Sequence, residues 1–283
     1  MLIDTGNPPF KGQKVSGSIW PELAEKGFLM SDRYFTSVLP NRWAGHTTNL
    51  KGNKRLYTSY FRDTLLVANL GECQRYFKHA DGKPIALNGQ DYMTYVVCDK
   101  QRASNQPVRI ITRADDFEYD ISQMDFLPCI NTIRTDYEIV SKMDAYGRTV
   151  GFRDDFYGVV GLNYKSDGRS RYFVAYAHNL FYDKCYKFFD WGELTSQQTI
   201  DRQHQWYAVD ILPKMTEESI RSVMEHPIVY YYLSLFFIDK INLGALKAMP
   251  AFDLSKVWDE EEIFDVLGLS VEEKDRVLER NAS

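Results

Sequence analysis

The chain has 283 residues, of which 44% are hydrophobic and 26% are charged, and its formal net charge is −5. These values indicate a globular protein with one large or two modest domains. The longest apolar run, residues 228–238, is shorter than the roughly 20 residues that cross a bilayer, which excludes a membrane span there and predicts a buried helix or strand.

The negative charge is unevenly distributed along the chain. Residues 226–283 hold 6 Lys or Arg and 11 Asp or Glu, whereas residues 1–225 hold 28 of each. A basic face within the neutral portion is therefore compatible with the overall acidity.

The cysteines and the N-terminus predict a cytoplasmic protein without metal. The N-terminus lacks a basic region followed by an apolar stretch and a small-residue cleavage site, so nothing in it suggests a secretion signal. The five histidines are scattered and form no metal motif, and the cysteines show no C-x-x-C pair and no histidine at ligand spacing. We expect the cysteines to be reduced and structural; they are Cys73, Cys98, Cys129 and Cys185.

Residues 1–100 alternate short apolar runs with helix-like stretches, as expected of an α/β sheet. The runs predict strands over residues 1–5, 34–39, 64–70 and 92–98. A helix is predicted to begin near Ser18 and to end at Gly27, and a second helix is predicted over residues 54–62. The polar, turn-rich residues 101–107 are the best candidate linker.

The pattern changes after residue 107. Short β-like runs such as residues 108–112 and 172–177 alternate with polar loops, and helical content is expected to be low except near residues 135–143. Helical spacing returns after Thr216, and the last segment predicts two short helices joined at Gly268.

The most specific motif is Asn7-Pro8-Pro9-Phe10, which immediately follows the first predicted strand. By composition such a string occurs by chance in roughly one chain of this size in several hundred. Two prolines stiffen a loop at the carboxyl end of a strand, where ligands of open α/β sheets bind. The alternative interpretation is a stiffened turn with Phe10 packed into the core.

This arrangement resembles motif IV of the amino-methyltransferases that methylate the exocyclic nitrogen of adenine. Other segments are similar to type II restriction-modification adenine methyltransferases. Residues 18–23 resemble the helix after the motif, residues 35–43 the next strand with its Pro-x-x-Trp end, and residues 92–100 the last hairpin strand. Residues 253–264 and 268–273 resemble a C-terminal tail of these enzymes. The resemblance covers residues 1 to about 100 and 245 to 280.

The resemblance implies a role for each residue of the motif. In the family the target adenine is flipped out of the duplex, and two acceptors localise the lone pair of its amino nitrogen. Carried over, these acceptors are the Asn7 side-chain oxygen and the Pro8 carbonyl, while Phe10 stacks on the base. Pro9 would keep the acceptors preorganised, and Trp43 is a further candidate substrate-binding residue. No metal is implied.

The methyl donor of the family is S-adenosylmethionine, and its usual site is missing from this sequence. The family places a Gly-rich turn upstream of motif IV, but only six residues precede Asn7 and no Gly-x-Gly string follows a later strand. We therefore expect a partner protein, most simply a separate subunit, to carry the donor-binding half-domain. Related sequences often carry Asp where this chain has Leu2, so a pocket that is inherited but no longer catalytic stays open as an interpretation.

The resemblance predicts an α/β protein with three parts. A partial Rossmann-like methyltransferase sheet occupies residues 1–104, a mostly β target-recognition domain that binds double-stranded DNA occupies residues 105–245, and a short helical tail occupies residues 246–283.

Within the recognition domain, the loop at residues 165–171 is polar and carries three cations. Lys165, Arg169 and Arg171 could contact phosphates or a guanine edge, although a solvated hairpin turn explains the loop equally well. The aromatic cluster at residues 181–191 is better explained by core packing. Basic residues expected around the pocket end of the sheet are Arg33, Arg42, His46, Lys51, Lys54 and Arg55.

Two functions follow from these patterns. The first is adenine-N6 methylation of DNA, with the base pocket in this chain and the donor bound mainly by a partner. The second is a non-catalytic DNA-binding or protein-interaction module that retains the pocket as a remnant.

Overall fold

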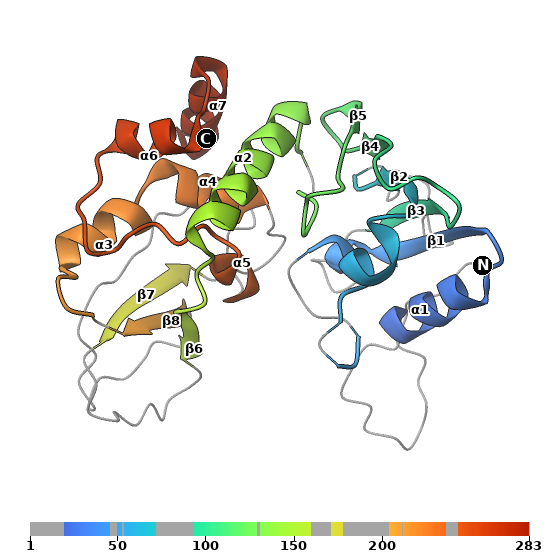
Figure 1. Ribbon diagram of the computed structural model, residues 1–283, viewed down its shortest axis with the longest axis horizontal. Coiled ribbons are helices and arrows are strands. Elements are labelled where there is room, and N and C mark those ends of the chain that lie inside the picture. Colours follow the sequence, from blue (N-terminus) through green and yellow to red (C-terminus); the bar gives the residue numbers. More distant parts are fainter. Residues whose placement is uncertain are drawn as a thin grey trace, which may run out of the picture. The chain divides into compact units, whose positions relative to one another are not determined.

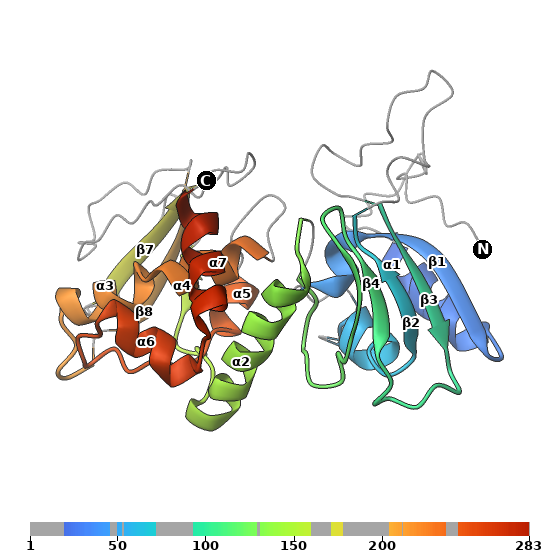
Figure 2. The ribbon, with the colours of Figure 1, turned by 90° about the horizontal axis from the view of Figure 1, so that it is seen from above.

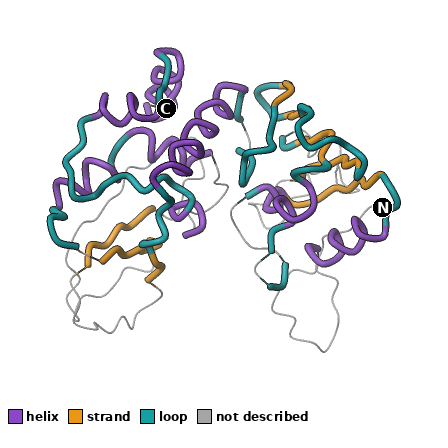
Figure 3. Tube along the Cα trace, viewed as in Figure 1, coloured by secondary structure: helices purple, strands orange, loops and turns teal. Residues whose placement is uncertain are grey.

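The computed structural model describes residues 20–45, 50–52, 54–71, 93–128, 131–159, 171–177, 204–210, 212–235 and 243–282 (Figure 1). The chain forms two compact units, residues 1–137 and 138–283. Each unit combines a β-sheet with helices (Figure 3), so the predicted α/β class is confirmed at this level. No helix in the described part of the chain is long and apolar enough to cross a membrane.

Unit 1 contains a five-stranded mixed sheet in the order β1-β3-β2-β4-β5 (Figure 2). Its elements are α1 (Trp20–Met30), β1 (Tyr34–Pro40), η1 (Asn41–Ala44), η2 (Tyr57–Phe61), β2 (Leu65–Asn69), β3 (Met93–Asp99), β4 (Val108–Ile111) and β5 (Asp116–Tyr119). Strand β3 is antiparallel to both β1 and β2, so β1 and β2 run parallel to each other. Strand β2 pairs in parallel with β4, and β5 closes the sheet as an antiparallel edge strand.

The core of unit 1 follows from the period of two along β1. Phe35, Ser37 and Leu39 are buried, whereas Tyr34 and Thr36 on either side of Phe35 are exposed. The Phe35 ring lies 5.7 Å from the ring of Phe28 on α1 and 5.7 Å from that of Phe61 on η2. Burying each such ring stabilises the fold by about 1.5–3 kcal/mol, so these contacts anchor α1 and η2 on one face of the sheet.

The predicted strands over residues 34–39, 64–70, 92–98 and 108–112 are confirmed as β1, β2, β3 and β4, and the predicted strand over residues 1–5 lies outside the described residues. Helix α1 continues past Gly27 to Met30, and the predicted helix over residues 54–62 is a short π-helical turn. Glycine in a helix costs only about 1 kcal/mol, which the buried Phe28 beside it offsets.

The prediction of a linker over residues 101–107 is wrong. This segment connects β3 to β4 within one sheet, and it is closed by backbone hydrogen bonds from Arg102 N to the Asp99 carbonyl (3.0 Å) and from Gln106 N to the Ala103 carbonyl (3.2 Å). Polar turn residues mark a strand connection as well as a domain boundary. Consequently β4 and β5 belong to the sheet of unit 1, which extends beyond the expected boundary after residue 104.

Unit 2 contains a three-stranded antiparallel sheet in the order β6-β8-β7 and several helices. Its elements are α2 (Arg134–Val150, whose first turn belongs to unit 1), β6 (Tyr157–Val159), β7 (Arg171–Ala177), β8 (His204–Asp210), α3 (Glu217–Met224), α4 (Pro227–Leu235), α5 (Leu243–Lys247), α6 (Glu260–Leu267) and α7 (Val271–Ala282).

The described part of residues 105–245 includes three helices, and they lie where helical segments are expected: α2 covers residues 135–143, and α3 and α4 follow Thr216. Helix α2 has 17 residues and extends beyond the predicted helical segment at both ends. Helix α4 is the apolar run recognised in the sequence, and its residues from Ile228 to Leu233 are buried. Helices α6 and α7 confirm the predicted pair joined at Gly268, which has the left-handed φ of 65° that ends α6.

Candidate functional site

The carboxyl ends of three parallel strands meet at one edge of the sheet in unit 1. Strand β1 ends at Pro40, β2 at Asn69 and β4 at Ile111. We call this edge, formed by residues 39–44, 69–71 and 111–113, the carboxyl edge. Ligands of open α/β sheets bind outside the carboxyl ends of their strands, so this is where the fold favours a site. The predicted pocket residues Asn7, Pro8, Pro9 and Phe10 lie outside the described residues.

Trp43 fixes the turn that follows β1. Its indole Nε1 donates a hydrogen bond to Thr94 Oγ1 on β3 (2.7 Å), and that hydroxyl donates in turn to the Leu39 carbonyl (2.6 Å). The Trp43 ring packs against the rings of Tyr57 and Phe61 at 6.1 and 5.5 Å. Both partners in the side-chain hydrogen bond have 0% exposed area.

This position differs from the expected contact between Trp43 and substrate. An indole without exposed area supports the carboxyl edge from inside the core, and its only polar atom is already paired. The Trp43 side chain at this Pro-x-x-Trp end therefore connects the end of β1 to β3 through Thr94. We call the hydrogen-bonded pair of Trp43 and Thr94 the latch.

Asn41 lies between Pro40 and the latch. Its side chain is 1% exposed, and neither Oδ1 nor Nδ2 has a hydrogen-bond partner in the described part of the chain. A buried polar group left unpaired costs about 1–3 kcal/mol. No sequence signal singles out this residue beyond its place inside the Pro-x-x-Trp segment.

Gly71 brings the ends of β2 and β4 together. A Cβ atom at position 71 would lie 2.5 Å from the Arg113 backbone nitrogen and 2.9 Å from the Thr112 carbonyl carbon. The Leu70 N–H donates to the Ile111 carbonyl at 2.7 Å, and Thr112 Oγ1 donates to the Thr132 carbonyl at 2.6 Å. Only glycine permits this close backbone approach.

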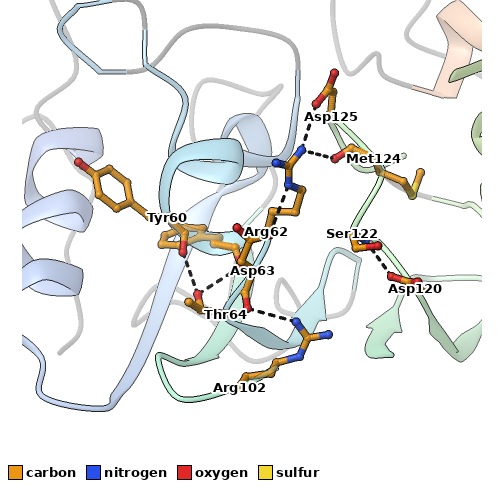
Figure 4. A network of polar contacts seen from close by, with 10 residues as sticks. Tyr60, Arg62, Asp63, Thr64, Arg102, Asp120, Ser122, Met124 and Asp125 are labelled. Carbon is orange, nitrogen blue, oxygen red and sulfur yellow. Dashed lines mark hydrogen bonds and ion pairs between the residues drawn. The ribbon is translucent and has the colours of Figure 1, made fainter. Parts of the chain in front are cut away.

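The opposite edge of the sheet holds a charged network (Figure 4). Arg62 Nη1 contacts Asp125 Oδ1 at 3.1 Å, and Arg102 Nη1 donates to the Asp63 carbonyl at 3.4 Å, next to the start of β2. Nearby, Arg33 forms a bidentate ion pair with Asp99 and holds the pKa of that carboxyl below its usual value. These groups pair with one another at the amino ends of the parallel strands, which gives them a structural role.

The basic residues predicted around the pocket do not form one surface. Arg33 precedes β1 and lies at the opposite edge, so its predicted position is wrong. Lys51 Nζ lies 3.2 Å from Glu22 Oε1, and Arg55 Nη1 donates to the Asp125 carbonyl at 3.3 Å. His46 lies outside the described residues. Charge alone could not distinguish these paired cations from cations available to phosphate.

In unit 2 the predicted DNA-reading residues are mostly not described. Lys165, Arg169 and the aromatic cluster at residues 181–191 lie outside the described residues, and Arg171 opens β7 opposite Asp210 of β8. The described surface of unit 2 has an open groove of about 670 Å³. Its lining consists of Glu217, Glu218, Arg221, Ser222, Glu225, His226, Pro227, Val257, Trp258 and Glu260.

This groove does not favour phosphate. Four of its side chains are glutamates, and Arg221 is neutralised by Glu217 at 2.8 Å and by Glu225 at 2.7 Å. Burial lowers the pKa of His226 to about 4, so its imidazole is uncharged at pH 7.

Neither a metal nor S-adenosylmethionine finds a fitting set of groups in the described residues. No three His, Cys, Asp or Glu side chains gather there into a metal-binding group. Cys98 is buried, and burial raises its pKa to about 12. The sequence has no Gly-x-Gly string, and Gly71 is a lone glycine at the carboxyl edge, so we derive no step through the methyl donor.

Comparisons with protein-family models, with curated proteins and with solved structures give no match. The interpretation of the site therefore depends on its residues and geometry.

Proposed function

We propose that this chain supplies the target-adenine pocket and a DNA-reading domain of a type II restriction-modification adenine-N6 DNA methyltransferase. One observation carries the proposal: the Asn7-Pro8-Pro9-Phe10 motif precedes a sheet in which the last hairpin strand, β3, is inserted antiparallel between two parallel strands. An inserted reversed strand of this kind is typical of the second half of a Rossmann-like methyltransferase sheet.

The chemistry explains why the motif needs these residues. The adenine amino nitrogen is a weak nucleophile because its lone pair is delocalised into the ring. In the proposal Asn7 Oδ1 and the Pro8 carbonyl accept its two hydrogens, Phe10 stacks on the ring, and Pro9 holds the acceptors in place. The base must first leave the duplex, which the DNA-reading domain makes specific.

The carboxyl edge supports this assignment. The motif follows a predicted strand, and the latch formed by Trp43 and Thr94 holds the turn that follows β1 in place. A rigid support is what a preorganised pair of acceptors requires. Lys165, Arg169 and Arg171 remain the proposed DNA contacts of the second unit, and the cytoplasm is the proposed location.

In the proposal, the methyl donor is bound by residues other than the Asn7-Pro8-Pro9-Phe10 motif. S-adenosylmethionine supplies the methyl group, and a donor-binding half-domain holds it, either on a partner protein or on a longer form of this chain. The experiment must therefore retain whatever carries that half-domain.

The test uses the full chain, tagged and purified from its native host together with the proteins bound to it. Mass spectrometry identifies the bound proteins, and N6-methyladenine is measured in DNA incubated with S-adenosylmethionine. We compare the natural sequence with Asn7→Ala and with the matched control Asn105→Ala, which changes an exposed asparagine in the β3–β4 connection.

The proposal expects adenine methylation in the purified mixture. Asn7→Ala should lower the rate by about 10²–10³-fold, as the loss of one preorganised polar contact does elsewhere, while DNA binding and the Asn105→Ala control stay unchanged. A chain that binds DNA without any methylation supports the non-catalytic function, and equal loss of methylation and binding in Asn7→Ala rules out a purely chemical role for Asn7.

A further inference from the structure

The open groove on unit 2 lies between α3 and the segment that leads into α6. Its volume of about 670 Å³ falls within the roughly 300–1,000 Å³ typical of ligand pockets. Its two walls are joined, because the Trp258 N–H donates to Ser222 Oγ at 3.0 Å and His226 Nε2 lies 3.0 Å from the Glu260 carbonyl. The groove is therefore a cavity of fixed walls within one compact unit.

Carboxylates set the charge of the groove. Glu217 and Glu225 share the guanidinium of Arg221, which is the one cation among the described lining residues. Glu218 and Glu260 are exposed, and neither forms an ion pair with a described residue. The groove therefore attracts cations and repels phosphate.

The apolar wall of the groove suits the aliphatic part of a basic side chain. Trp258 lines it together with Pro227 and Val257, and Val257 is 49% exposed. The Trp258 ring already receives one cation of this chain, since Lys256 Nζ lies 4.1 Å from the ring centroid. Aromatic faces attract ammonium and guanidinium groups, and long basic side chains pack their stems on apolar surface.

The described geometry favours an organic cation over a metal ion. Divalent cations need several oxygen ligands close together, and no three His, Cys, Asp or Glu side chains gather into such a group among the described residues. A guanidinium, in contrast, is already held here: Arg221 Nε donates to Glu217 Oε1 at 2.8 Å, and its Nη1 donates to Glu225 Oε1 at 2.7 Å.

We propose that this groove is a docking site for a basic segment of a partner protein. Glu218 and Glu260 pair with the cationic ends of its side chains, and the wall that contains Trp258 packs against their stems. The inference goes beyond the proposed function, because it concerns a surface that attracts cations and needs neither methyl transfer nor the Asn7 motif.

The test measures binding of a capped nonapeptide of alternating arginine and serine to the full chain by isothermal titration calorimetry. Arginine is chosen because its planar fork pairs with carboxylates and stacks on aromatic rings. A peptide with glutamine in place of arginine is the control ligand.

Two double variants separate the groove from the overall charge. The groove variant carries Glu218→Gln and Glu260→Gln. The control variant carries Glu118→Gln and Glu272→Gln, which remove the same charge from exposed positions outside the groove. Because all four side chains are exposed, both variants should keep the fold.

The arginine peptide should bind equally well to the natural sequence and to the control variant. Its binding to the groove variant should be about five- to thirtyfold weaker, as expected for the loss of two surface ion pairs. Binding should nearly vanish in about 1 M salt, where the Debye length is only about 3 Å, and the glutamine peptide should not bind. In NMR spectra the Trp258 indole N–H signal, assigned from its loss in Trp258→Phe, should shift when the arginine peptide is added.

Three results would overturn the inference. Absence of binding at low salt excludes the basic segment, and equal weakening in both double variants shows that only the overall charge attracts the peptide. A Trp258 signal that shifts with a DNA duplex or with Mg²⁺ but not with the arginine peptide assigns the groove to a different ligand. Each of these results leaves the methyltransferase proposal to its own experiment, because peptide binding requires no methylation.

Discussion

Acidification from pH 7 to pH 4 should destabilise unit 2 through the imidazole of His226. This side chain is 4% exposed and connects α4 to α6: Nε2 lies 3.0 Å from the Glu260 carbonyl, and Nδ1 accepts a hydrogen bond from the Ile228 N–H at 3.1 Å. The arrangement requires a neutral ring with its hydrogen on Nε2, because a second hydrogen on Nδ1 would face the Ile228 donor.

The magnitude follows from the pKa. Burial lowers the pKa of His226 from 6.5 to about 4, and the opposing contributions of the Glu260 carbonyl and the Glu261 carboxylate are smaller. Between pH 6.5 and pH 4 the unfolded chain binds more protons than the folded chain. The contribution of neutral His226 to the free energy of unfolding is therefore complete above pH 6.5 and is lost as the pH falls towards 4. At 1.36 kcal/mol per pKa unit the loss in the free energy of unfolding is about 3 kcal/mol.

The assay combines denaturant unfolding at pH 7, 5.5 and 4 with an NMR titration of the imidazole. His226→Asn is the control, because its Oδ1 can still accept from the Ile228 N–H but does not titrate. From pH 7 to pH 4 the free energy of unfolding of the variant should fall by about 3 kcal/mol less than that of the natural sequence, because the other titrating groups are the same in both. An imidazole that titrates near 6.5, or an equal loss in the variant, would refute the reasoning.

Three other predictions concern unit 1. Gly71→Ala should lower the free energy of unfolding by about 2–4 kcal/mol, since the added Cβ would meet the Arg113 backbone at 2.5 Å; an unchanged urea midpoint would contradict the close approach. Trp43→Phe and Thr94→Val should each destabilise the fold by about 1–3 kcal/mol, and a double-mutant cycle should give a coupling of at least about 0.5 kcal/mol, whereas additive effects would show that their hydrogen bond contributes nothing. Cys98, which is buried with its pKa raised to about 12, should react with a thiol reagent at pH 8 only after unfolding, and modification of the native protein at Cys98, located by peptide mass spectrometry, would disprove its burial.

The sequence predicts the strands of unit 1 well because their cores are short apolar runs bounded by turn residues. Buried and exposed residues alternate along β1, and the run at β3, which lies between two strands, is nearly continuous, so both patterns differ from that of an amphipathic helix. Strand β5 escapes this reading because exposed Asp116 and Glu118 alternate with buried Phe117 over only four residues. An edge strand with charged side chains has too few apolar residues to be recognised.

The candidate site is less accessible to sequence reasoning. The resemblance identifies the Pro-x-x-Trp segment, but a pattern cannot tell that Trp43 turns inward to Thr94 while Asn41 has no hydrogen-bond partner among the described residues. Thr94 and Gly71 gain their roles from residues that are distant in sequence, at the end of β1 and directly after β4. Such contacts depend on the strand order, which the sequence does not state.

The strand order of unit 1 has a consequence for protein synthesis. Strand β3 lies between β1 and β2 although it follows both in the sequence, so β1 cannot pair with it until the ribosome has passed Asp99. At about 5–20 residues per second, the roughly 60 residues between the ends of β1 and β3 take about 3–12 s to translate. During that interval the apolar side chains of β1 lack their strand neighbour, and a chaperone that holds the nascent chain until β3 emerges would raise the yield of folded protein.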